Sequence, residues 1–405
     1  MIVYEMKLEG KNSQYEALDN AIRTGRFVRN SVIRGWMDGE VKSRNDAYKY
    51  CKILADNPEF PWAKQLNSMA RQAHAERGWA SVERFYRNCQ KKIKGKKGFP
   101  QFKKHTTRAS VEYKTSGWKL SEDRKYITFS DGFNAGTFRL WGSRDLHYYQ
   151  FKQIKRVRVI RRCDGYYAQF LIDYNRKIDK ELTGIQRGID VNLENFYTDS
   201  QGVRVENPRF LRKDEKKLKK HQRRLSRTNK GSKNRAKARQ RLGKAHLKVS
   251  RKRKDWVCKL AQSVIQLSDL VAIEDLQVRN MVRNRNLAKS INDASWSMFR
   301  QWLEYFGSIY GVPVIAVAPH WTSIDCSQCG EKVVKALSTR THKCPHCGYN
   351  TSRDENSARN ILKKALAQLA NTVGHTEINA SGENPLWQPL AIDVGKGTRR
   401  KRKLS

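Results

Sequence analysis

The sequence predicts an α+β protein built from several domains. Apolar residues recur at helical spacing early in the chain, for example at Leu18, Ile22 and Val28. From about residue 106 to 180 the chain becomes rich in aromatic and β-branched residues and carries the turn signals of short strands. Later, apolar runs of strand length alternate with long helical patterns. A chain of 405 residues is long enough for about two to four such modules.

The first half of the chain is predicted to hold two interleaved modules. Residues 1–11 and 104–182 are expected to form one small antiparallel β-barrel. Residues 12–103 are expected to form a helical lobe, inserted between the first strand of the barrel and the others. The boundary falls near Gly98-Phe99-Pro100, where the character of the sequence changes.

One hairpin of this barrel is predicted from a short motif. Asp164-Gly165 separates two apolar runs, and an Asp-Gly pair favours the tight turn that joins antiparallel strands. The aromatic residues of this region could stack on nucleic-acid bases, but we expect them to pack in the core; they include Trp118, Tyr126, Phe129 and Trp141.

A third module is predicted from residues 183–322 together with residues 351–372. Strands are expected near residues 185–191 and 195–198, followed by the turn Asp199-Ser-Gln-Gly202. Later elements are a strand at 270–273, a helix at 294–309, a strand at 312–317 and a helix from Asp354 to about residue 369. The tail of residues 373–405 lacks periodicity, is basic at its end, and is expected to be flexible.

The charge of the chain indicates a polyanionic partner. There are 82 Lys and Arg against 39 Asp and Glu, a formal net charge of +43. Residues 209–254 alone carry 22 Lys or Arg and only two acids, and they are expected to form long helices broken near Asn229-Lys230-Gly231. Because phosphates would neutralise this repulsion, nucleic acid is the expected partner, and no amphipathic anchor favours a membrane surface.

Four cysteines form two closely spaced pairs. Cys326 and Cys329 belong to one Cys-x-x-Cys knuckle, and Cys344 and Cys347 belong to a second, each followed by a glycine. Such knuckles place four thiolates around one tetrahedral Zn²⁺, so residues 323–350 are predicted to form a small structural zinc ribbon. His342 and His346 are expected to be surface residues, since the thiolates complete the ligand set.

Three acidic residues far apart in the chain are candidate catalytic residues. Asp190 and Glu274 each come at the end of an apolar run, and Asp354 opens a helix. This is the chain order of an RNase H-like fold, although any single one of them could be a cap or a turn residue. Three ionised carboxylates repel one another unless cations lie between them. Two Mg²⁺ ions roughly 4 Å apart would relieve this repulsion and support in-line phosphodiester cleavage.

Other catalytic patterns are absent from the sequence. It contains no Gly-x-x-x-x-Gly-Lys-Ser/Thr loop and no Gly-x-Ser-x-Gly elbow. The first residues do not resemble a secretion signal, and no apolar stretch approaches the roughly 18 residues of a membrane span. We therefore expect a cytoplasmic, nucleoid-associated protein.

Several stretches of the chain resemble the TnpB family of transposon-encoded RNA-guided nucleases, which are ancestral to the type V CRISPR effectors. They lie at residues 98–104, 187–192, 272–276, 291–296 and 353–361, together with both cysteine knuckles. The last of these reads Arg-Asp-Glu-Asn-Ser-Ala-Arg-Asn-Ile, and its position shortly after a zinc ribbon is specific. Ser357 departs from the small residue, such as Ala, expected there.

The resemblance implies a wedge-like β-barrel interrupted by a helical recognition lobe, then a RuvC nuclease domain with the zinc ribbon inserted in it. It also implies a guide RNA, a double-stranded DNA target beside a short adjacent motif, and one protein copy in the particle. On this resemblance Asp190, Glu274 and Asp354 fall on the RuvC acids, and Cys326, Cys329, Cys344 and Cys347 on the zinc ligands.

Two other classes of protein share part of this pattern. A DNA transposase also uses three acids and metal ions, but it would join DNA ends. A non-cleaving RNA-guided DNA-binding repressor would explain the charge and the zinc without using the acids. A small effector encoded in a CRISPR locus is an alternative within the same class.

Overall fold

The computed structural model describes residues 1–376, except residues 94, 105–109, 144 and 337. The predicted tail of residues 373–405 therefore lies mostly outside the described residues. The chain divides into two units, one formed by residues 1–177 and 210–254 and the other by residues 178–209 and 255–405. None of the helices in the described part of the chain is both long and apolar enough to cross a membrane.

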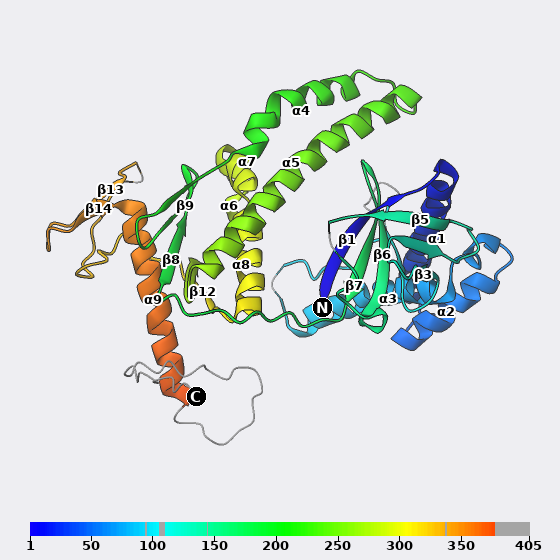
Figure 1. Cartoon of the computed structure of the whole chain (residues 1–405), viewed down its shortest axis with the longest axis horizontal. Helices are drawn as coiled ribbons and strands as arrows, with labels where there is room; N and C mark the ends of the chain where they lie inside the picture. Colours follow the sequence, from blue (N-terminus) through cyan, green and yellow to red (C-terminus); the bar gives the residue numbers. More distant parts are fainter. Residues whose placement is uncertain (94, 105–109, 144, 337, 377–405) are drawn as a thin grey trace, which may run out of the picture. The chain divides into compact units, whose positions relative to one another are not determined.

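A seven-stranded antiparallel sheet forms the centre of the first unit (Figure 1). The strand order is β2-β6-β7-β1-β5-β4-β3. The N-terminal strand lies between β7 and β5, so the chain leaves the sheet after β1 and returns to it at β2. The strands are β1 (Ile2–Glu9), β2 (Ser110–Tyr113), β3 (Trp118–Leu120), β4 (Tyr126–Phe129), β5 (Gly136–Trp141), β6 (Ile154–Arg162) and β7 (Gly165–Ile172), with a short 3-10 helix η2 (Phe151–Gln153) before β6.

The predicted hairpin is present between β6 and β7. Arg162 pairs with Gly165 across a two-residue turn, and Gly165 has a φ of 139°, which disfavours a side chain there. The core under this sheet is aromatic, with Tyr113, Phe129 and Phe138 among its fully buried side chains. The same core includes Met6 and Leu8 of β1, so it joins residues from both sides of the helical insertion.

Three helices fill the insertion between β1 and β2. They are α1 (Asn12–Met37), α2 (Arg44–Asp56) and α3 (Ser68–Gln90), with a short 3-10 helix η1 (Pro61–Ala63) before α3. Ser43 caps α2 and Asn67 caps α3 through side-chain oxygens that accept backbone N–H groups. A separate apolar cluster that includes Val32, Cys51 and Trp79 holds the three helices together.

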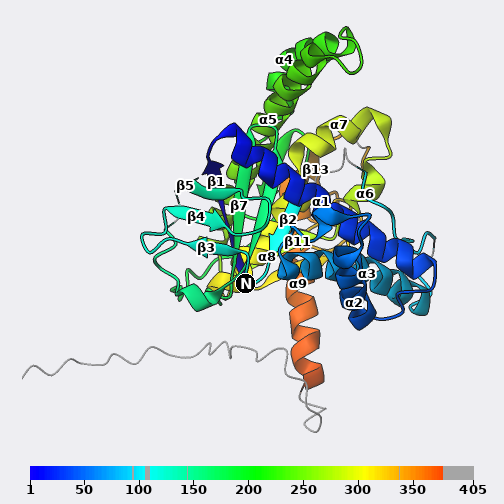
Figure 2. The same ribbon diagram turned by 90° about the vertical axis from the view of Figure 1, so that its right-hand side faces the viewer.

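The basic segment forms a helical hairpin of α4 (Phe210–Ser226) and α5 (Lys233–Gln266), visible as two adjacent helices in Figures 1 and 2. Leu218, Leu242 and Val249 form its narrow apolar seam. The break falls where the sequence predicted it, and Arg235 donates to the carbonyl oxygens of Leu225 and Thr228 across the turn. The second helix is longer than predicted, because its pattern continues beyond residue 254.

The second unit contains a five-stranded mixed sheet with the order β10-β9-β8-β11-β12. The pairs β10/β9 and β9/β8 are antiparallel, whereas β11 is parallel to both β8 and β12. The strands are β8 (Gln186–Val191), β9 (Asn195–Asp199), β10 (Arg204–Glu206), β11 (Leu270–Glu274) and β12 (Val314–Val317).

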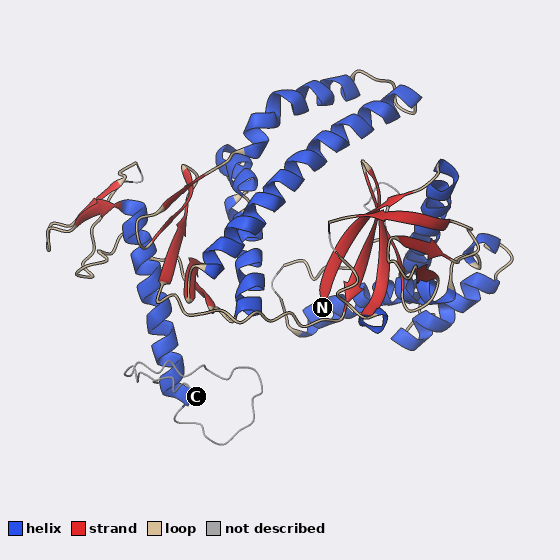
Figure 3. Cartoon of the chain, viewed as in Figure 1, coloured by secondary structure: helices blue, strands red, loops and turns tan. Residues whose placement is uncertain are grey.

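Helices lie on both faces of this sheet (Figure 3). The helix α9 (Arg353–Thr376) packs on one face through Ile361 and Ala365. The end of α5 and the helix α8 (Trp296–Tyr310) pack on the other face. The remaining elements are α6 (Val278–Met281), α7 (Arg285–Ala294), and the hairpin of β13 (Thr341–Lys343) with β14 (Asn350–Ser352).

A turn stabilised by a buried acid follows β9, as predicted. Asp199 is fully buried and forms an ion pair with Arg187. It also accepts hydrogen bonds from the backbone of Gln201 and Val203, at 3.0 and 2.8 Å. The turn closes at Gly202, whose φ is 83°. Because every carboxylate oxygen has a partner, the buried charge is compensated.

The predicted helix at 294–309 starts two residues later and is preceded by a separate helix. Ser295 has a φ of 61° and ends α7, with its N–H bonded to the carbonyl oxygen of Ile291. The chain then turns and α8 begins at Trp296. The apolar pattern of the sequence continues through Ser295, so it does not reveal the left-handed backbone conformation that separates the two helices.

Gly188 sets how closely α9 approaches the sheet. A Cβ at this position would lie 2.1 Å from the carbonyl oxygen of Ala358 and 2.9 Å from the Cβ of Leu362. Both atoms belong to α9, and the backbone oxygen cannot rotate away. Glycine is therefore required here for the helix to lie against β8.

We predict that Gly188→Ala destabilises the protein by roughly 1–3 kcal/mol, because α9 has to move off the sheet. Thermal and urea unfolding measure the effect. Gly142→Ala is the matched control, since its one close contact would be with the side-chain Cγ of Met6, at 2.9 Å, and not with a backbone atom. Equal stability of the two variants would contradict the packing argument.

Candidate active site and zinc ribbon

The three predicted acids come together at one end of the mixed sheet. Asp190 is the penultimate residue of β8, Glu274 is the last residue of β11, and Asp354 is in the first turn of α9. The two strands are parallel neighbours with Ile189 opposite Ile273, so Asp190 and Glu274 follow in the same register. The close contact at Gly188 places the start of α9 beside them.

Asp190 lies close enough to Glu274 and Asp354 for their charges to interact. Burial raises the pKa of Asp190 well above its ordinary value, and the charges of Glu274 and Asp354 raise it further. Arg353 and Arg340 oppose this effect only in part. Burial also raises the pKa of Glu274, against the hydrogen bond that it accepts from Thr322. Because ionising these buried carboxyl groups is unfavourable without a positive charge nearby, the site is suited to a cation.

Hydrogen bonds to neighbouring side chains orient two of the acids. The Nδ2 of Asn192 donates to Oδ2 of Asp354 at 3.2 Å. The hydroxyl of Thr322 donates to Oε1 of Glu274 at 2.7 Å, and Thr322 is only 4% exposed. Sequence reasoning gave neither residue a role. Asn192 could have been found from its place two residues after Asp190, whereas nothing in the sequence marks Thr322.

Two arginines lie beside the same cluster. The Nε of Arg353 is 3.7 Å from Oδ1 of Asp354, and the Nη1 of Arg340 is 4.0 Å from the same oxygen. Arg340 also pairs with Glu194 at 3.4 Å and is about half exposed. The carboxylates are thus bordered by cations on the solvent side.

Three carboxylates are a chemically suitable set of ligands for a hard divalent cation. Carboxylate oxygens are the ligands that Mg²⁺ prefers. Among the residues that the structure describes, however, only the four cysteines bring three or more potential ligand atoms within 4.8 Å of one another. The oxygens of the three carboxylates therefore lie farther apart than the ligands of a single ion would. Two ions side by side would match this wider spacing.

The cysteine knuckles form the second candidate metal site. The Sγ atoms of Cys326 and Cys347 are 3.7 Å apart, and those of Cys329 and Cys344 are 3.6 Å apart. A Zn–S bond of about 2.3 Å in a tetrahedral site requires a sulfur separation of roughly 3.8 Å. All four sulfurs lie within 4.8 Å of one another. The cluster therefore fits a structural zinc ion.

Each knuckle is closed by the glycine that follows it. Gly330 donates to the carbonyl oxygen of Cys326, and Gly348 donates to that of Cys344, at 2.9 and 3.0 Å. Their φ angles are 85° and 76°, which a residue with a side chain rarely adopts. The sequence pattern therefore predicted both the ligands and the turn chemistry.

The prediction that both histidines of this segment lie at the surface is wrong for His342. His342 is fully buried, and its Nδ1 contacts the Nζ of Lys335. It alternates with exposed neighbours in β13, so its ring points into the small core beside Tyr349. His346 is exposed, as predicted.

Two asparagines of α9 join the ribbon to the acid cluster. Asn356 accepts from the N–H of Ser327 and donates to the carbonyl oxygen of Asp325, both at 2.8 Å. Asn360 donates to the carbonyl oxygens of Thr322 and Asp325, at 2.9 and 2.7 Å. The strand-to-ribbon connection, including Thr322, is therefore fixed to the helix that carries Asp354.

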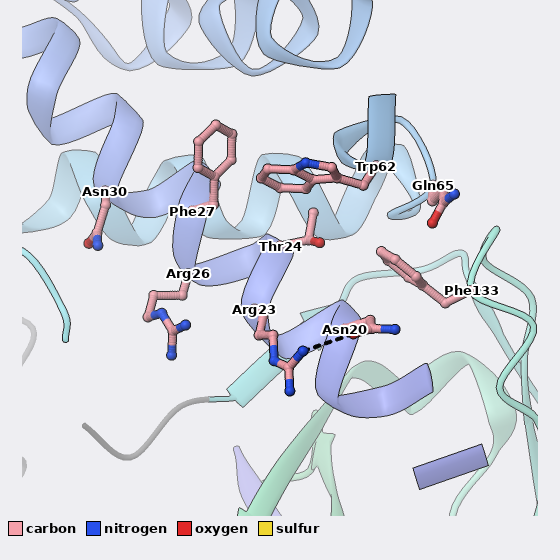
Figure 4. Close-up of a pocket in the computed structure, with 9 residues that line it drawn as sticks. All are labelled: Asn20, Arg23, Thr24, Arg26, Phe27, Asn30, Trp62, Gln65 and Phe133. Carbon is pink, nitrogen blue, oxygen red and sulfur yellow. Dashed lines mark hydrogen bonds between the residues drawn. The ribbon is translucent and has the colours of Figure 1, made fainter. Parts of the chain in front are cut away.

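A cavity of about 600 Å³ lies in the first unit (Figure 4). The rings of Phe27, Trp62 and Phe133 line it together with Arg23 and polar side chains of α1. Phe27 and Trp62 contact each other edge to face, with centroids 4.6 Å apart. Aromatic faces beside arginine and amide groups are the chemistry of nucleic-acid contact.

The prediction that the barrel aromatics are core residues holds for only part of the set. Phe129 is 2% exposed, but Trp141 is 50% exposed and Tyr126 is 41% exposed. Trp141 lies at the end of β5, where Arg139 covers its ring at 4.7 Å. Strand periodicity alone does not distinguish an aromatic residue on the outer face from one in the core.

Comparison with known proteins finds two family models that match parts of the chain. A family model described as "Probable transposase" matches residues 169–285, and one described as "Cas12f1-like, TNB domain" matches residues 296–361. The protein named "Putative RNA-guided DNA endonuclease InsQ" of Escherichia coli (strain K12) is 29% identical over 384 residues, which cover 91% of this chain and 87% of that protein.

Another relative is more similar over a shorter region. The "Putative RNA-guided DNA endonuclease" of Streptomyces pristinaespiralis is 38% identical over 185 residues, which cover 45% of this chain and 46% of that protein. The alignment thus spans about half the length of this relative.

Two solved structures share the fold. A Cas12f1-sgRNA-target DNA complex matches with a TM-score of 0.50 and 15% identity, over 86% of this chain and 81% of that chain. The mini-RNA-guided endonuclease CRISPR-Cas_phi3 matches with a TM-score of 0.51 and 10% identity, over 90% and 92%. The chain therefore has the α+β architecture of these small effectors. Together with the family models, these matches support a member of the TnpB family.

We predict that Cys344→Ser loses the bound zinc, because three thiolates and a hydroxyl hold Zn²⁺ much more weakly than four thiolates. Metal analysis of the purified protein measures the zinc content. Cys89→Ser is the control, since Cys89 is an exposed free cysteine outside the ribbon. Full zinc content in the Cys344→Ser protein would exclude this ligand set.

We predict that Asp190→Asn stabilises the protein in Mg²⁺-free buffer, and that the gain grows as the pH rises. In the unfolded chain Asp190 ionises near its ordinary pKa, but in the fold burial and repulsion raise that pKa. The free energy of unfolding therefore decreases as the pH rises between the two values, and asparagine escapes this decrease.

Melting temperatures between pH 4 and pH 8 test this, with a gain on the order of 4 °C expected at the upper end. Asp255→Asn serves as the control, because that carboxylate is exposed and pairs with Lys259 on the same helix. A gain that does not change with pH would contradict the repulsion argument.

Proposed function

We propose that this protein is an RNA-guided DNA endonuclease. It binds a guide RNA derived from a transposon and cleaves matching double-stranded DNA beside a short adjacent motif. The observation that carries the proposal is the convergence of Asp190, Glu274 and Asp354 at one sheet end within a strongly basic chain. The names of its relatives support the same activity.

The domain assignment follows the predicted boundaries. We assign residues 1–11 and 104–182 to a wedge domain and residues 12–103 to a recognition lobe. We assign residues 183–322 and 351–372 to an RNase H-like RuvC domain, with the zinc ribbon of residues 323–350 inserted in it. In chain order the sheet has three antiparallel strands, β8 to β10, and then two parallel strands, β11 and β12. Asp190 lies on the first of these five strands and Glu274 on the fourth, which supports this assignment.

The acids would act as ligands for Mg²⁺ in this proposal. Asp190, Glu274 and Asp354 would hold the metal, which when bound supplies charge neutralisation and an activated water for phosphodiester hydrolysis. Asn192 holds Oδ2 of Asp354, and Thr322 holds Oε1 of Glu274, so each keeps one carboxylate in a fixed orientation. Arg340 is exposed beside Asp354, where it would attract the backbone of an incoming strand.

The positive charge would hold the guide and its target. In RNA-guided proteins base pairing reads the sequence, so the protein needs mainly to grip the phosphate backbone. Residues 209–254, which form most of the α4–α5 hairpin, carry 22 Lys or Arg against two acids, and a narrow apolar seam joins the two helices. Arg251 joins the hairpin to the barrel through Asp164 and Tyr167 of the β6–β7 hairpin, at 2.6 and 2.7 Å. We include the cavity of Figure 4 in the nucleic-acid surface.

A transposase is the second candidate, favoured by the description of the first family model. It would use the same acids but would join DNA ends. A strand-transfer assay with purified protein distinguishes the two, because joined products favour the transposase and linear cut products favour the endonuclease.

We predict that Asp190→Ala abolishes cleavage, with a loss of at least about 1000-fold, while guided DNA binding persists. Removing one carboxylate removes a metal ligand but leaves the basic surfaces unchanged. The test compares cleavage of a matched plasmid in Mg²⁺ with binding measured by gel shift. Asp255→Asn is expected to cut at the wild-type rate, and wild-type cutting by the Asp190→Ala protein would refute the site.

A further inference from the structure

A second cavity, of about 310 Å³, lies directly beside the acid cluster. Glu274 itself lines it, so the cavity opens at the candidate cleavage site. Its walls come from the end of β11, the segment that follows this strand, and the first turns of α8. Cavities of this size are typical of small-molecule and nucleotide-sized ligands.

Apolar and aromatic side chains form part of this cavity's lining, and Ser297, Gln301 and charged side chains form the rest. Its lining includes Ile273, Leu276, Val278 and Phe299. Trp296, the last residue of the motif at residues 291–296, also lines it and is 6% exposed. Ile273, Trp296 and Phe299 belong to the core of the second unit, which holds these walls in place.

Trp296, which lines this cavity, carries a buried hydrogen-bond donor. Its indole N–H is buried and has no acceptor among the described residues. A buried donor without a partner costs about 1–3 kcal/mol, and an acceptor supplied from outside the fold would remove that cost. Phenylalanine would fill similar space without that cost.

The charges at the rim show what kind of group can enter. Arg300 is the cation that lines the cavity, and it is already paired with Asp275 and Glu304, the latter at 2.8 Å. Together with Glu274, the acids of this rim outnumber its cations. A phosphate inside the cavity would therefore be repelled, whereas a neutral ring would not.

We propose that this cavity holds the base of the nucleotide adjacent to the cleaved bond, on the DNA strand that enters the acid cluster. The apolar walls would contact the faces of the base, and the indole N–H of Trp296 would donate to one of its carbonyl or ring-nitrogen acceptors. The sugar and phosphate would remain outside, at the acids. This inference rests on the proposed endonuclease function and adds a base-binding position to it.

Photo-crosslinking tests the location directly. The probe is a target DNA with 4-thiothymidine at the nucleotide next to the cut, bound by the guided Asp190→Ala protein so that it is not cleaved. Mass spectrometry is expected to find the crosslink within residues 273–304. Crosslinks found only outside this segment would overturn the proposal.

Filling the cavity tests its role in cleavage. Val278→Trp is expected to lower the cleavage rate by roughly 100-fold, because the base is displaced and the reacting bond shifts, while guided DNA binding remains unchanged. Val334→Trp is the matched control, since Val334 is 86% exposed. Cleavage by the Val278→Trp protein at the wild-type rate would overturn the proposal.

A conservative variant tests the hydrogen bond and does not depend on how well the bulky variant folds. Trp296→Phe keeps the ring and removes the N–H. Cleavage rates are measured on four substrates that differ only at the nucleotide next to the cut. For the base that the wild-type protein cuts fastest, the rate of the Trp296→Phe protein is expected to differ from the wild-type rate by roughly tenfold. Unchanged rates on all four would remove Trp296 from base contact.

The outcomes also separate this inference from the function on which it rests. If the wild-type protein makes no guide-dependent cut, the proposed function fails. If the wild type cuts while both variants match it, the function stands and only the base-binding cavity is refuted.

Discussion

The close approach of α9 to β8 at Gly188 is the constraint on which the second unit depends. A methyl group at Gly188 would lie 2.1 Å from the Ala358 carbonyl oxygen, so the helix can rest against the strand only because this residue has no side chain. Asp354 lies one turn before Ala358, and Asp190 lies two residues after Gly188. One backbone contact thus determines whether the acids at the sheet end face the acid of the helix.

The same helix also fixes the zinc ribbon. Asn356 and Asn360 bond to the connection between β12 and the first cysteine knuckle, and this connection carries Thr322, which holds Glu274. The zinc site is small and has little apolar core of its own. Metal binding there would therefore stabilise a loop that helps to orient a candidate catalytic acid, although zinc takes no part in the proposed chemistry.

The chain combines an excess of positive charge with a local concentration of acids. With a net charge of +43 the protein repels itself unless phosphates bind it. At the sheet end the groups that repel one another are negative instead, and burial and this repulsion raise the pKa of Asp190. Both forms of repulsion are relieved by the partners proposed here, nucleic acid in one case and divalent cations in the other. Under this proposal the free protein would be less stable than its complex.

The sequence by itself determined the elements that depend on local spacing. The cysteine pairs and their glycines, the Asp164-Gly165 hairpin and the break in the basic hairpin were predicted from it, because each depends on neighbouring residues. The three acids were selected by their positions at the ends of apolar runs and at the start of a helix, and their role stays a prediction. Only the tertiary structure decided the contacts of Thr322 with Glu274 and of Asn192 with Asp354, which join residues 48 and 162 positions apart. It also decided that His342 is buried, that Trp141 is exposed, and that a cavity lies beside Glu274. These features depend on which faces meet after folding, and periodicity shows that a face is apolar without showing what packs against it.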